Sequence, residues 1–508
     1  MIPVIEPSEI KILENHLLQK NEDNNLLQAK AVDGVVKLLK PRLSSYSSLI
    51  ILVGTGLNGK DGLLIGKKIQ DDIEEIQVKF LSIASSKSST NNLEVAESLN
   101  IPLEAADESS LNKLNMKNYL IIDAILGISS RLPMRPQISE KLKLINDLKL
   151  KTSSYLISLD LPSGFDPESG QSDPNTIVAE EVFFLGYQTS QTLSDPARFT
   201  SSQYIDLGVL EQDLSELNIN NTQVITTTLA NNIYPERSDA LHKNRFGSHL
   251  IIAGSSKYPG AGILCARASN KSGAGYTTLA STSRIIEEAV AVVPEVMFIS
   301  LTDIKENTDS FFSKIDKYDS LSIGSGLGTS ELSKIILSSL EEYLTNSSID
   351  QNIVIDADAL NILSEKTYWW ESFPETTTIT PHLGEIEKLA KIDKKNINLQ
   401  VISSLAKDWK KIIVMKGPNT AVAFPDGSIK VNTKPNGGMS KPGMGDVLTG
   451  IIGSLASNPQ IPLSDATALG VFIHSMAGKL ARDKYGSTSM TSSDVISFIP
   501  QIFKYIEN

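Results

Sequence analysis

Short apolar runs that end in glycine or aspartate recur along the whole chain, and longer segments of helical spacing separate many of them. Such runs are found at residues 49–53, 119–122, 156–159, 249–253, 353–355 and 412–414. Helical spacing is clear at residues 287–293 and 332–343. This alternation predicts an α/β protein with largely parallel sheets. Parallel sheets of this kind bind their ligands at the carboxyl ends of the strands.

The chain is divided by one polar stretch, residues 211–228, which contains the sequence NINNTQ. A chain of 508 residues is too long for one ordinary hydrophobic core. The polar stretch therefore predicts two α/β domains, one over residues 1–215 and one over residues 225–508.

The sequence SKPGMGDVLTG at residues 440–450 places two glycines and an aspartate where a helix is predicted to begin. Backbone N–H groups around residues 443–445 and the start of the helix favour a bound anion such as phosphate. Asp446 would be unfavourable beside phosphate unless it took part in the chemistry. Its carboxylate can accept the proton of an attacking hydroxyl while the N–H groups hold the charge of a transferred phosphoryl group. The alternative is that Asp446 only caps the helix.

Composition narrows the class of protein. Apolar residues make up 41% and charged residues 21%, which is typical of a globular protein. The net charge of −12, with no dense basic stripe, argues against a nucleic-acid partner. The single cysteine, Cys265, excludes an internal disulfide and a cysteine metal site. We find no signal peptide and no apolar run long enough to span a membrane, so we expect a cytoplasmic enzyme.

The first half contains the glycine pattern G-x-G-x-x-G at Gly54, Gly56 and Gly59, between a predicted strand and a predicted helix. An ordinary dinucleotide site also needs an acid at the end of the next strand. That strand, residues 78–83, is followed by Ala-Ser-Ser instead, which argues against an ordinary NAD site. A glycine turn that serves only close packing is the alternative.

Two further strands of the first half end in acids, in the sequences IIDAILG and SLDLPSGFDPESG. Side chains of this kind orient hydroxyl groups or a cation, although Asp and Ser also cap helices and form turns. Together with GTGLNGKDG, these segments resemble the NAD(P)H-hydrate epimerase family over most of residues 1–215. The resemblance implies a Rossmann-like three-layer domain with a K⁺ site at Asn58, Asp123 and Ser163. It also implies substrate contacts from Asp160 and from the loop Gly127, Ile128, Ser129, Ser130 and Arg131.

The first half departs from this family at three places. Leu57 and Lys60 stand where the family has an asparagine and a glycine, and residues 182–193 lack a lysine that the family carries. Epimerisation needs a proton-transfer group of suitable pKa. We therefore expect this domain to keep its fold and to have weak or no epimerase activity.

Several motifs occur in order over residues 242–450 of the second half. They are HKxxFG, GSxxYPGA, GxGLG, DADALN, TPHxGE, KGxxT and GMxxxGxGDVLTG. His382 and Lys416 lie in loops within them, where either could also be an ordinary exposed polar residue. As a set the motifs resemble the ADP/ATP-dependent NAD(P)H-hydrate dehydratase family, which has the ribokinase-like fold, over nearly all of residues 225–508.

This second resemblance implies that Asp446 activates the hydroxyl of hydrated NADH or NADPH, which then attacks the terminal phosphate of ADP or ATP, with Mg²⁺ as the companion ion. The residues implied to bind the hydrated dinucleotide are Ala261, Gly326, His382 and Asp446. Those implied to bind the adenine nucleotide are Lys416, Gly417, Pro418, Asn419, Thr420 and Gly445. Pro442 and Met444 replace a glycine and a hydroxyl residue usual in the last loop.

Two other functions stay open from the sequence. A small-molecule kinase of the same fold would leave the phosphate on its product, and a nucleotide sensor would bind without turnover. The sequence does not decide between ADP and ATP or between the two hydrated dinucleotides. A homo-oligomer is compatible with the sequence, which leaves the oligomeric state open.

Overall fold

The computed structural model describes residues 2–21, 24–83, 91–114, 118–152, 154–193, 199–219, 221–235, 243–301, 311–312, 315–346 and 351–507. The chain folds into two compact units, Met1–Val224 and Ile225–Asn508. The division lies within the polar stretch 211–228, which carries the helix α7 (Glu211–Glu216) and the strand β10 (Thr222–Val224) rather than an open linker. The first unit thus extends beyond residue 215.

The first unit is built on a parallel sheet of seven strands in the order β4-β3-β2-β5-β6-β7-β9. These strands are β2 (Ser48–Val53), β3 (Gln77–Ser82), β4 (Leu103–Ala105), β5 (Tyr119–Ala124), β6 (Tyr155–Leu159), β7 (Ala179–Leu185) and β9 (Phe199–Ile205). A separate parallel pair joins β1 (Val4–Ile5) to β8 (Gln188–Thr189). The other helices are α1 (Ile10–Asn21), α2 (Asn24–Leu39), α3 (Leu57–Asp72), α4 (Asn91–Ser98), α5 (Glu108–Asn112) and α6 (Pro136–Lys151).

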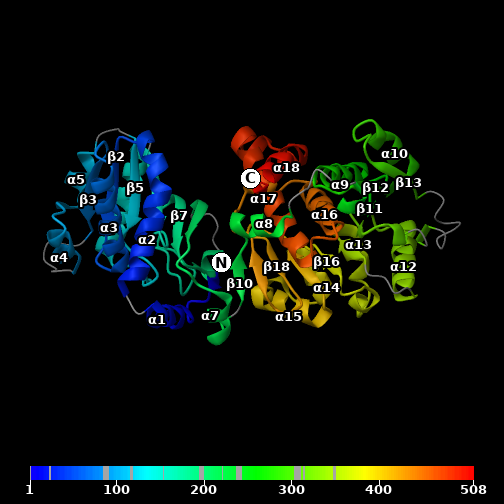
Figure 1. Ribbon diagram of the computed structural model, residues 1–508, viewed down its shortest axis with the longest axis horizontal. Helices are drawn as coiled ribbons and strands as arrows, with labels where there is room; N and C mark the ends of the chain where they lie inside the picture. The colour runs from blue at the N-terminus through cyan, green and yellow to red at the C-terminus, as the bar shows by residue number, and fades with distance from the viewer. Residues whose placement is uncertain are drawn as a thin grey trace. The chain divides into compact units, whose positions relative to one another are not determined.

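Strand β2 shows why helices cover both faces of this sheet (Figure 1). All six of its residues are buried, and they alternate between two cores. Leu49, Ile51 and Val53 belong to the core that α2 and α3 cover, whereas Ile50 and Leu52 belong to the core that α6 covers. This is the continuous apolar run that a two-sided parallel sheet requires.

The glycine loop after β2 is shaped by close packing. A Cβ atom on Gly54 would lie 1.7 Å from the carbonyl oxygen of Ile125, at the exit of the neighbouring strand β5. No side chain fits there, so the packing explanation holds for this glycine. The chain winds away from β2 and β5 in opposite directions, and such a point in the sheet order is where α/β sheets form their ligand crevice.

In the second unit, strands β11 to β19 form a mixed sheet in the order β19-β18-β17-β16-β15-β14-β11-β12-β13, in which only the β17-β18-β19 pairs are antiparallel. The strands are β11 (Ser248–Ile252), β12 (Tyr276–Ser281), β13 (Met297–Ser300), β14 (Ser320–Ile323), β15 (Asn352–Ile355), β16 (Thr377–Ile379), β17 (Ile412–Met415), β18 (Ala421–Ala423) and β19 (Ile429–Val431). The helices are α8 (Thr227–Ile233), α9 (Pro259–Lys271), α10 (Ser283–Val290), α12 (Glu331–Asn346), α13 (Ala357–Leu363), α14 (Leu383–Ala390), α15 (Leu399–Trp409), α16 (Met444–Ala456), α17 (Leu463–Ser489) and α18 (Ser492–Ile506).

The predicted helix after the GMGD sequence is confirmed as α16, and its apolar residues lie in a core shared with α17 and α18 (Figure 1). The helix predicted at 332–343 is confirmed within α12. The prediction for residues 287–293 is wrong at its end, because α10 stops at Val290. Pro294 follows four residues later, and the residue before a proline is disfavoured in helical conformation.

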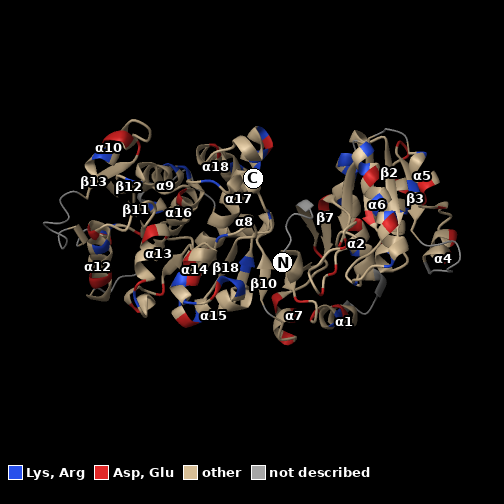
Figure 2. Ribbon diagram, turned by 180° about the vertical axis from the view of Figure 1, so that it is seen from behind, with Lys and Arg blue, Asp and Glu red and all other residues tan. Residues whose placement is uncertain are grey.

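Basic and acidic residues are interspersed along the ribbon of each unit (Figure 2). Among the described residues, none of the helices has both the length and the apolar character that crossing a bilayer requires.

Each unit has its own hydrophobic cores, so we predict that residues 225–508 fold when expressed alone. Trp369, Trp370 and Trp409 are the only tryptophans and all lie in the second unit, so their fluorescence reports its unfolding in the full chain as well. We expect one cooperative urea transition with a midpoint close to that of the full chain. Aggregated protein, or a midpoint several molar lower, would contradict the independence of this unit.

Candidate active site

The carboxyl ends of five neighbouring strands of the second unit, β11, β14, β15, β16 and β17, meet at one edge of the sheet. From β11 the chain continues to β12, and from β14 it continues to β15, which lies on the opposite side of the β11–β14 pair. Open α/β sheets form their ligand crevice at such a point. Five of the seven sequence motifs of the second half follow these strands. The fold therefore gathers residues that are up to about 190 positions apart in the chain.

Ala261 and Gly326, both expected to contact the hydrated dinucleotide, lie side by side. Gly326 has a φ of 60°, and a Cβ atom on it would lie 2.5 Å from the Cβ of Ala261. The loop of Gly326 is attached to the loop after β11, because Gly254 N donates to the Ser325 carbonyl oxygen at 2.9 Å. A residue larger than glycine would be excluded here by both conformation and space.

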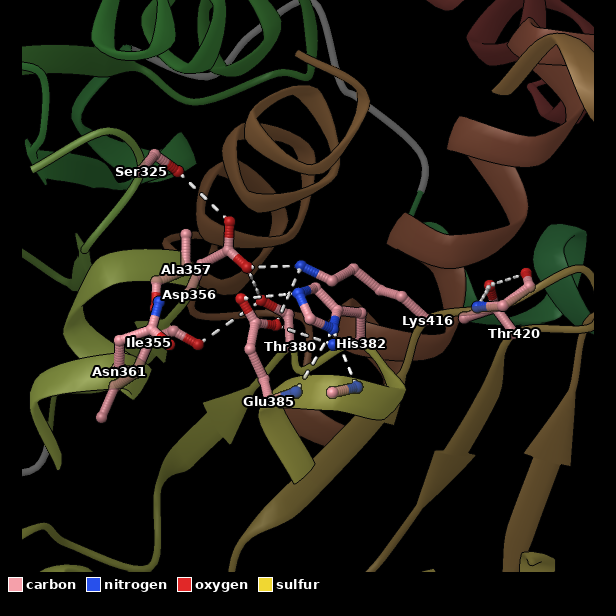
Figure 3. Close-up of polar contacts among 12 residues, drawn as sticks. Ser325, Ile355, Asp356, Ala357, Asn361, Thr380, His382, Glu385, Lys416 and Thr420 are labelled. Carbon is pink, nitrogen blue, oxygen red and sulfur yellow. Dashed lines mark hydrogen bonds and ion pairs between the residues drawn. The ribbon is translucent and has the colours of Figure 1, made fainter. Parts of the chain in front are cut away.

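A buried ion pair lies at the centre of the edge (Figure 3). The Lys416 ammonium is 2.7 Å from Oδ1 of Asp356, which directly follows β15 and is 1% exposed. Thr380 Oγ1 donates to the same oxygen at 2.6 Å, and Ser325 Oγ donates to Oδ2 at 3.4 Å. Burial opposes ionisation of Asp356, but Lys416 and the Thr380 hydroxyl hold its pKa below the usual range. Burial likewise opposes the charge on Lys416, and Asp356 and Glu385 together raise its pKa.

His382 forms the first turn of α14 together with Glu385 (Figure 3). Its Nδ1 accepts from Gly384 N at 3.0 Å and Glu385 N at 3.2 Å, while the Glu385 carboxylate accepts from His382 N at 2.7 Å. Because Nδ1 is an acceptor, a neutral ring carries its proton on Nε2. The imidazole is 60% exposed. His382 is thus a helix cap that also presents a ring to the site, and Lys416 N bonds the adjacent Pro381 carbonyl oxygen at 2.8 Å.

Asp446 lies in the first turn of α16 but does not cap this helix. The capping position is Gly443, with a φ of 89° and no side-chain cap, so the purely structural alternative for Asp446 is not met. Burial raises the pKa of Asp446 to about 6, and the neighbouring Asp356 charge adds to the shift. A Cβ atom on Gly445 would lie 3.5 Å from the Lys416 ammonium and 3.8 Å from Asp356 Oδ2. The start of α16, Lys416 and two carboxylates therefore converge.

The turn after β17 is open beside this group. Gly417 and Pro418 are exposed, and a Cβ atom on Gly417 would meet no atom within 4 Å. Thr420 Oγ1 donates to the Gly417 carbonyl oxygen at 3.1 Å, and Asn432 N bonds the Thr420 carbonyl oxygen at 2.8 Å. The predicted nucleotide-binding residues Lys416 to Thr420 thus form a turn that these hydrogen bonds hold in place, and the turn is exposed at Gly417 and Pro418.

The first unit brings together the three residues expected to hold a cation. Ser163 donates to Asp123 through both its backbone N, at 2.9 Å, and its Oγ, at 2.6 Å. Asn58 Nδ2 donates to the carbonyl oxygens of Leu126, at 2.8 Å, and Leu159, at 3.2 Å. Leu126 N in turn donates to Ser163 Oγ at 2.9 Å. Asp123 is completely buried, and burial raises its pKa although four hydrogen bonds favour the carboxylate.

Asp160 lies near this group at the end of β6, in a left-handed conformation with a φ of 60°. Burial raises its pKa to about 7, and the charge of Asp61 adds to the shift. Asp61 itself, on α3, has a pKa raised by burial to about 6 and accepts from Gln28 Nε2 at 2.6 Å. Tyr187, in the segment without lysine, donates to Glu14 Oε1 at 2.8 Å.

Only part of the loop 127–131 lies close to the candidate cation-binding residues. A Cβ atom on Gly127 would lie 3.5 Å from the Cβ of Asn58, and Ser130 is buried. The exposed Arg131 instead forms an ion pair with Glu168 at 2.8 Å and donates to the Ile128 and Ser130 carbonyl oxygens.

Sequence reasoning missed five residues that build the two sites. They are Asp61 and Asn92 in the first unit and Asp356, Thr380 and Glu385 in the second. Asp356, Thr380 and Glu385 were inside the DADALN and TPHxGE motifs, and a rule that tests every strand-end acid would have found Asp356. Asn92 had no such signal. Its buried amide donates to the Gly54 and Gly56 carbonyl oxygens, at 2.8 and 2.9 Å, across residues 84–90, which lie outside the described part of the chain.

Comparison with known proteins matches both halves. Residues 249–501 match the family described as NAD(P)H-hydrate dehydratase, and residues 24–189 match the YjeF-related protein N-terminus. The bifunctional NAD(P)H-hydrate repair enzyme Nnr of Vibrio cholerae is 31% identical over 389 residues, covering 75% of this chain and 74% of that protein. The enzyme of the same description from Thermofilum pendens is 26% identical over 523 residues, covering 99% of this chain and 96% of that protein.

The chain belongs to the family of bifunctional NAD(P)H-hydrate repair enzymes. A solved ribokinase-like superfamily protein from Enterococcus faecalis shares the fold of the second unit, with a TM-score of 0.51, 24% identity and coverage of 57% of this chain and 98% of that one. The expected family and both expected folds are thereby confirmed. In this repair family the epimerase domain comes first and the dehydratase domain second, which is the order of the two matched regions.

The raised pKa of Asp446 predicts a stability effect with a definite sign. Its pKa is about 6 in the folded protein and 3.8 ordinarily, so the charged carboxylate destabilises the fold fully above pH 6 and not at all below about pH 4. We expect Asp446→Asn to stabilise the second unit at pH 7.5 by ~1–2 kcal/mol, below the ~3 kcal/mol limit of this shift. Urea unfolding followed by tryptophan fluorescence at pH 7.5 and 4 measures it. The exposed Asp408→Asn is the control, and equal gains at both pH values would contradict the prediction.

Proposed function

We propose that the second unit dehydrates the 6S hydrates of NADH and NADPH at the expense of ADP or ATP. The observation that carries the proposal is the convergence of Asp446, the Lys416 ammonium and the start of α16 on one space that Gly445 leaves open. This places a proton acceptor beside two sources of positive potential, as transfer of a phosphoryl group to a hydroxyl requires.

Asp446 is the catalytic base of this proposal. With a pKa of about 6 it is mostly ionised at neutral pH, and it is a stronger proton acceptor than an ordinary aspartate. It takes the proton of the C6 hydroxyl, whose oxygen attacks the terminal phosphorus as the bond to the nucleotide breaks. Phosphate is a better leaving group than hydroxide, so it departs from C6 with its bonding electrons while C5 loses a proton, and the C5=C6 double bond of the nicotinamide ring is restored.

The other predicted residues hold the two substrates on either side of Asp446. The N–H groups of the first turn of α16, including Gly445, have no partners within the helix and suit the phosphates. Lys416 adds a fixed charge, and the open backbone of residues 417–420 suits the rest of the nucleotide. Ala261 and Gly326, which pack against each other, and the exposed imidazole of His382 bind the hydrated dinucleotide in this proposal.

The two proposed metal ions differ in how well the residues fit them. Among the described residues of the second unit, no three His, Cys or carboxylate ligand atoms gather, so Mg²⁺ has no dedicated protein cluster and we assign it no step. K⁺ fits the first unit better. Asn58 Oδ1 is buried without a hydrogen-bond partner beside the carbonyl oxygen of Leu126, and Asp123 and Ser163 complete a set of oxygen ligands. K⁺ there would fix the loop that follows β5.

We propose that the first unit is the epimerase domain, with Asp160 and the loop 127–131 on the hydrated dinucleotide. Asp160, with a pKa of about 7, is suited to proton transfer at neutral pH. The second group expected from the family, a lysine after β7, is absent, and the segment supplies Tyr187 instead. Because burial raises the pKa of this tyrosine well above 10, it is a poor base.

Replacement of Asp446 tests the dehydratase. Asp446→Asn removes the proton acceptor and should lower turnover by ~10²–10⁴-fold, while ADP binds as well or better because a nearby negative charge is gone. The assay follows absorbance of the reduced nicotinamide after the full chain is mixed with hydrated NADH, Mg²⁺ and ADP or ATP. Normal turnover of the variant would place the base elsewhere. For the unmodified protein, a stable phosphorylated product would indicate a kinase, and binding without turnover would indicate a sensor.

The missing lysine predicts slow epimerisation by the first unit. We expect the R hydrate to be converted at a rate well below that of an epimerase with an intact site, and Asp160→Asn to abolish the remainder. The assay supplies the R epimer with an excess of an epimerase-free dehydratase and subtracts spontaneous epimerisation. A rate equal to that of an intact epimerase would show that another group replaces the lysine.

A further inference from the structure

Asp356 stands at the centre of the second site, although the proposed function gives it no contact with either substrate. It is the first residue after β15, it is 1% exposed, and it is charged, because its pKa is held low. Burying a carboxylate costs several kcal/mol unless it is paired and hydrogen-bonded. A charge kept in this place therefore calls for an explanation beyond packing.

Three side-chain donors from different loops converge on the Asp356 carboxylate (Figure 3). Oδ1 accepts from Lys416 Nζ at 2.7 Å and Thr380 Oγ1 at 2.6 Å, and Oδ2 accepts from Ser325 Oγ at 3.4 Å. The donors follow three different strands, β17, β16 and β14. The carboxylate is thus hydrogen-bonded to the loops that follow three strands. Lys416 is the only one of these three donors that carries a charge.

The backbone after Asp356 is also held in an unusual conformation. Ala357 has a φ of 48°, in the left-handed region that is unfavourable for a residue with a Cβ atom. Gly324, with a φ of 123°, approaches so closely that a Cβ atom on it would lie 1.9 Å from the Asp356 carbonyl oxygen. The surrounding loops therefore impose the direction in which Asp356 leaves the sheet.

Lys416 would not remain at its present position without a counter-charge. Its ammonium lies next to Gly445 in the first turn of α16, and a helix N-terminus repels cations. The second carboxylate, of Glu385, is 3.9 Å away and already accepts from His382 N. Asp356 at 2.7 Å is the close counter-charge, and a phosphate would be attracted by both Lys416 and the helix.

We propose that Asp356 is a positioning residue that holds the Lys416 ammonium against the start of α16, where the transferred phosphoryl group of the nucleotide is to lie. This inference rests on the proposed function, and it adds a role for a residue that touches neither substrate. Lys416 is then set in place before the nucleotide binds, instead of being drawn there by the phosphate. Preorganisation of this kind is worth one to two orders of magnitude in rate.

A double-mutant cycle on the full chain tests the proposal, with Asp356→Asn, Lys416→Met and the combined variant. In the unmodified background we expect Asp356→Asn to lower kcat by ~10–100-fold, with the KM for the hydrated dinucleotide changed less than twofold. In the Lys416→Met background, Asp356→Asn should lower kcat no further. Equal effects of Asp356→Asn in both backgrounds would overturn the proposal.

ADP binding measured by calorimetry without the hydrate separates this inference from the proposed function. Lys416→Met leaves Asp356 buried without its cation beside the phosphates, so ADP affinity should fall. Adding Asp356→Asn removes that uncompensated charge and should restore part of the affinity. The four proteins give this readout even if the unmodified chain shows no dehydration, which would reject the proposed function alone. Additive effects on affinity, or no ADP binding by the unmodified chain, would reject the positioning role.

Two further variants guard against misfolding and against a general charge effect. Thr380→Val keeps the charge of Asp356 and removes one hydrogen bond, so we expect a smaller fall in kcat, of a few-fold. If Asp356→Asn does not fold, an unchanged kcat of Thr380→Val rejects the proposal. Glu375→Gln removes the same chemical group from an exposed ion pair with Lys410, at 2.9 Å, and should leave kcat and ADP affinity unchanged.

Discussion

The parallel sheet is the constraint on which both sites depend. Parallel strands deliver their carboxyl ends to one edge, and the loops that follow carry the polar residues of the chain's motifs. In the first unit this edge collects Asp123 from the end of β5 and Asp160 and Ser163 from the segment that follows the adjacent strand β6. In the second it collects the glycine loop of Gly326, Asp356, His382 and Lys416. Each site is therefore made of residues that are distant in sequence and adjacent only because of strand order.

The buried carboxylates at these edges are stabilised in different ways, and the difference indicates what each can do. Asp123 accepts four hydrogen bonds, two of them from Ser163, and suits a fixed ligand role. Asp356 is paired with Lys416 and stays ionised. Asp160 and Asp446 have no cation within ion-pair distance among the described residues, and burial raises the pKa of each toward neutrality. Groups that titrate near neutral pH are the ones suited to proton transfer.

The two units differ in how completely they retain this arrangement. In the second unit the proposed base Asp446, the Lys416 ammonium and the helix N-terminus lie together, and Met444, where the family usually has a hydroxyl residue, is a buried side chain rather than a donor. In the first unit the ligands expected for a cation are in contact, but Lys60 stands in the first turn of α3 and no lysine follows β7. The structure thus keeps the framework of the epimerase domain and changes the groups that would move protons.

The sequence by itself determined the α/β class, the approximate division at residues 211–228 and the helix that begins after Gly443, and it indicated part of each candidate site. It could do so because apolar periodicity and glycine or aspartate at strand ends are local properties of the chain. Only the tertiary structure decided that Gly326 touches Ala261, that Asn92 closes the glycine loop and that Asp356 pairs with Lys416. These contacts depend on which strands are neighbours, and strand order follows from packing of the whole sheet. The pKa values of Asp160 and Asp446 were beyond the sequence for the same reason, since burial and neighbouring charges exist only once the strands have assembled.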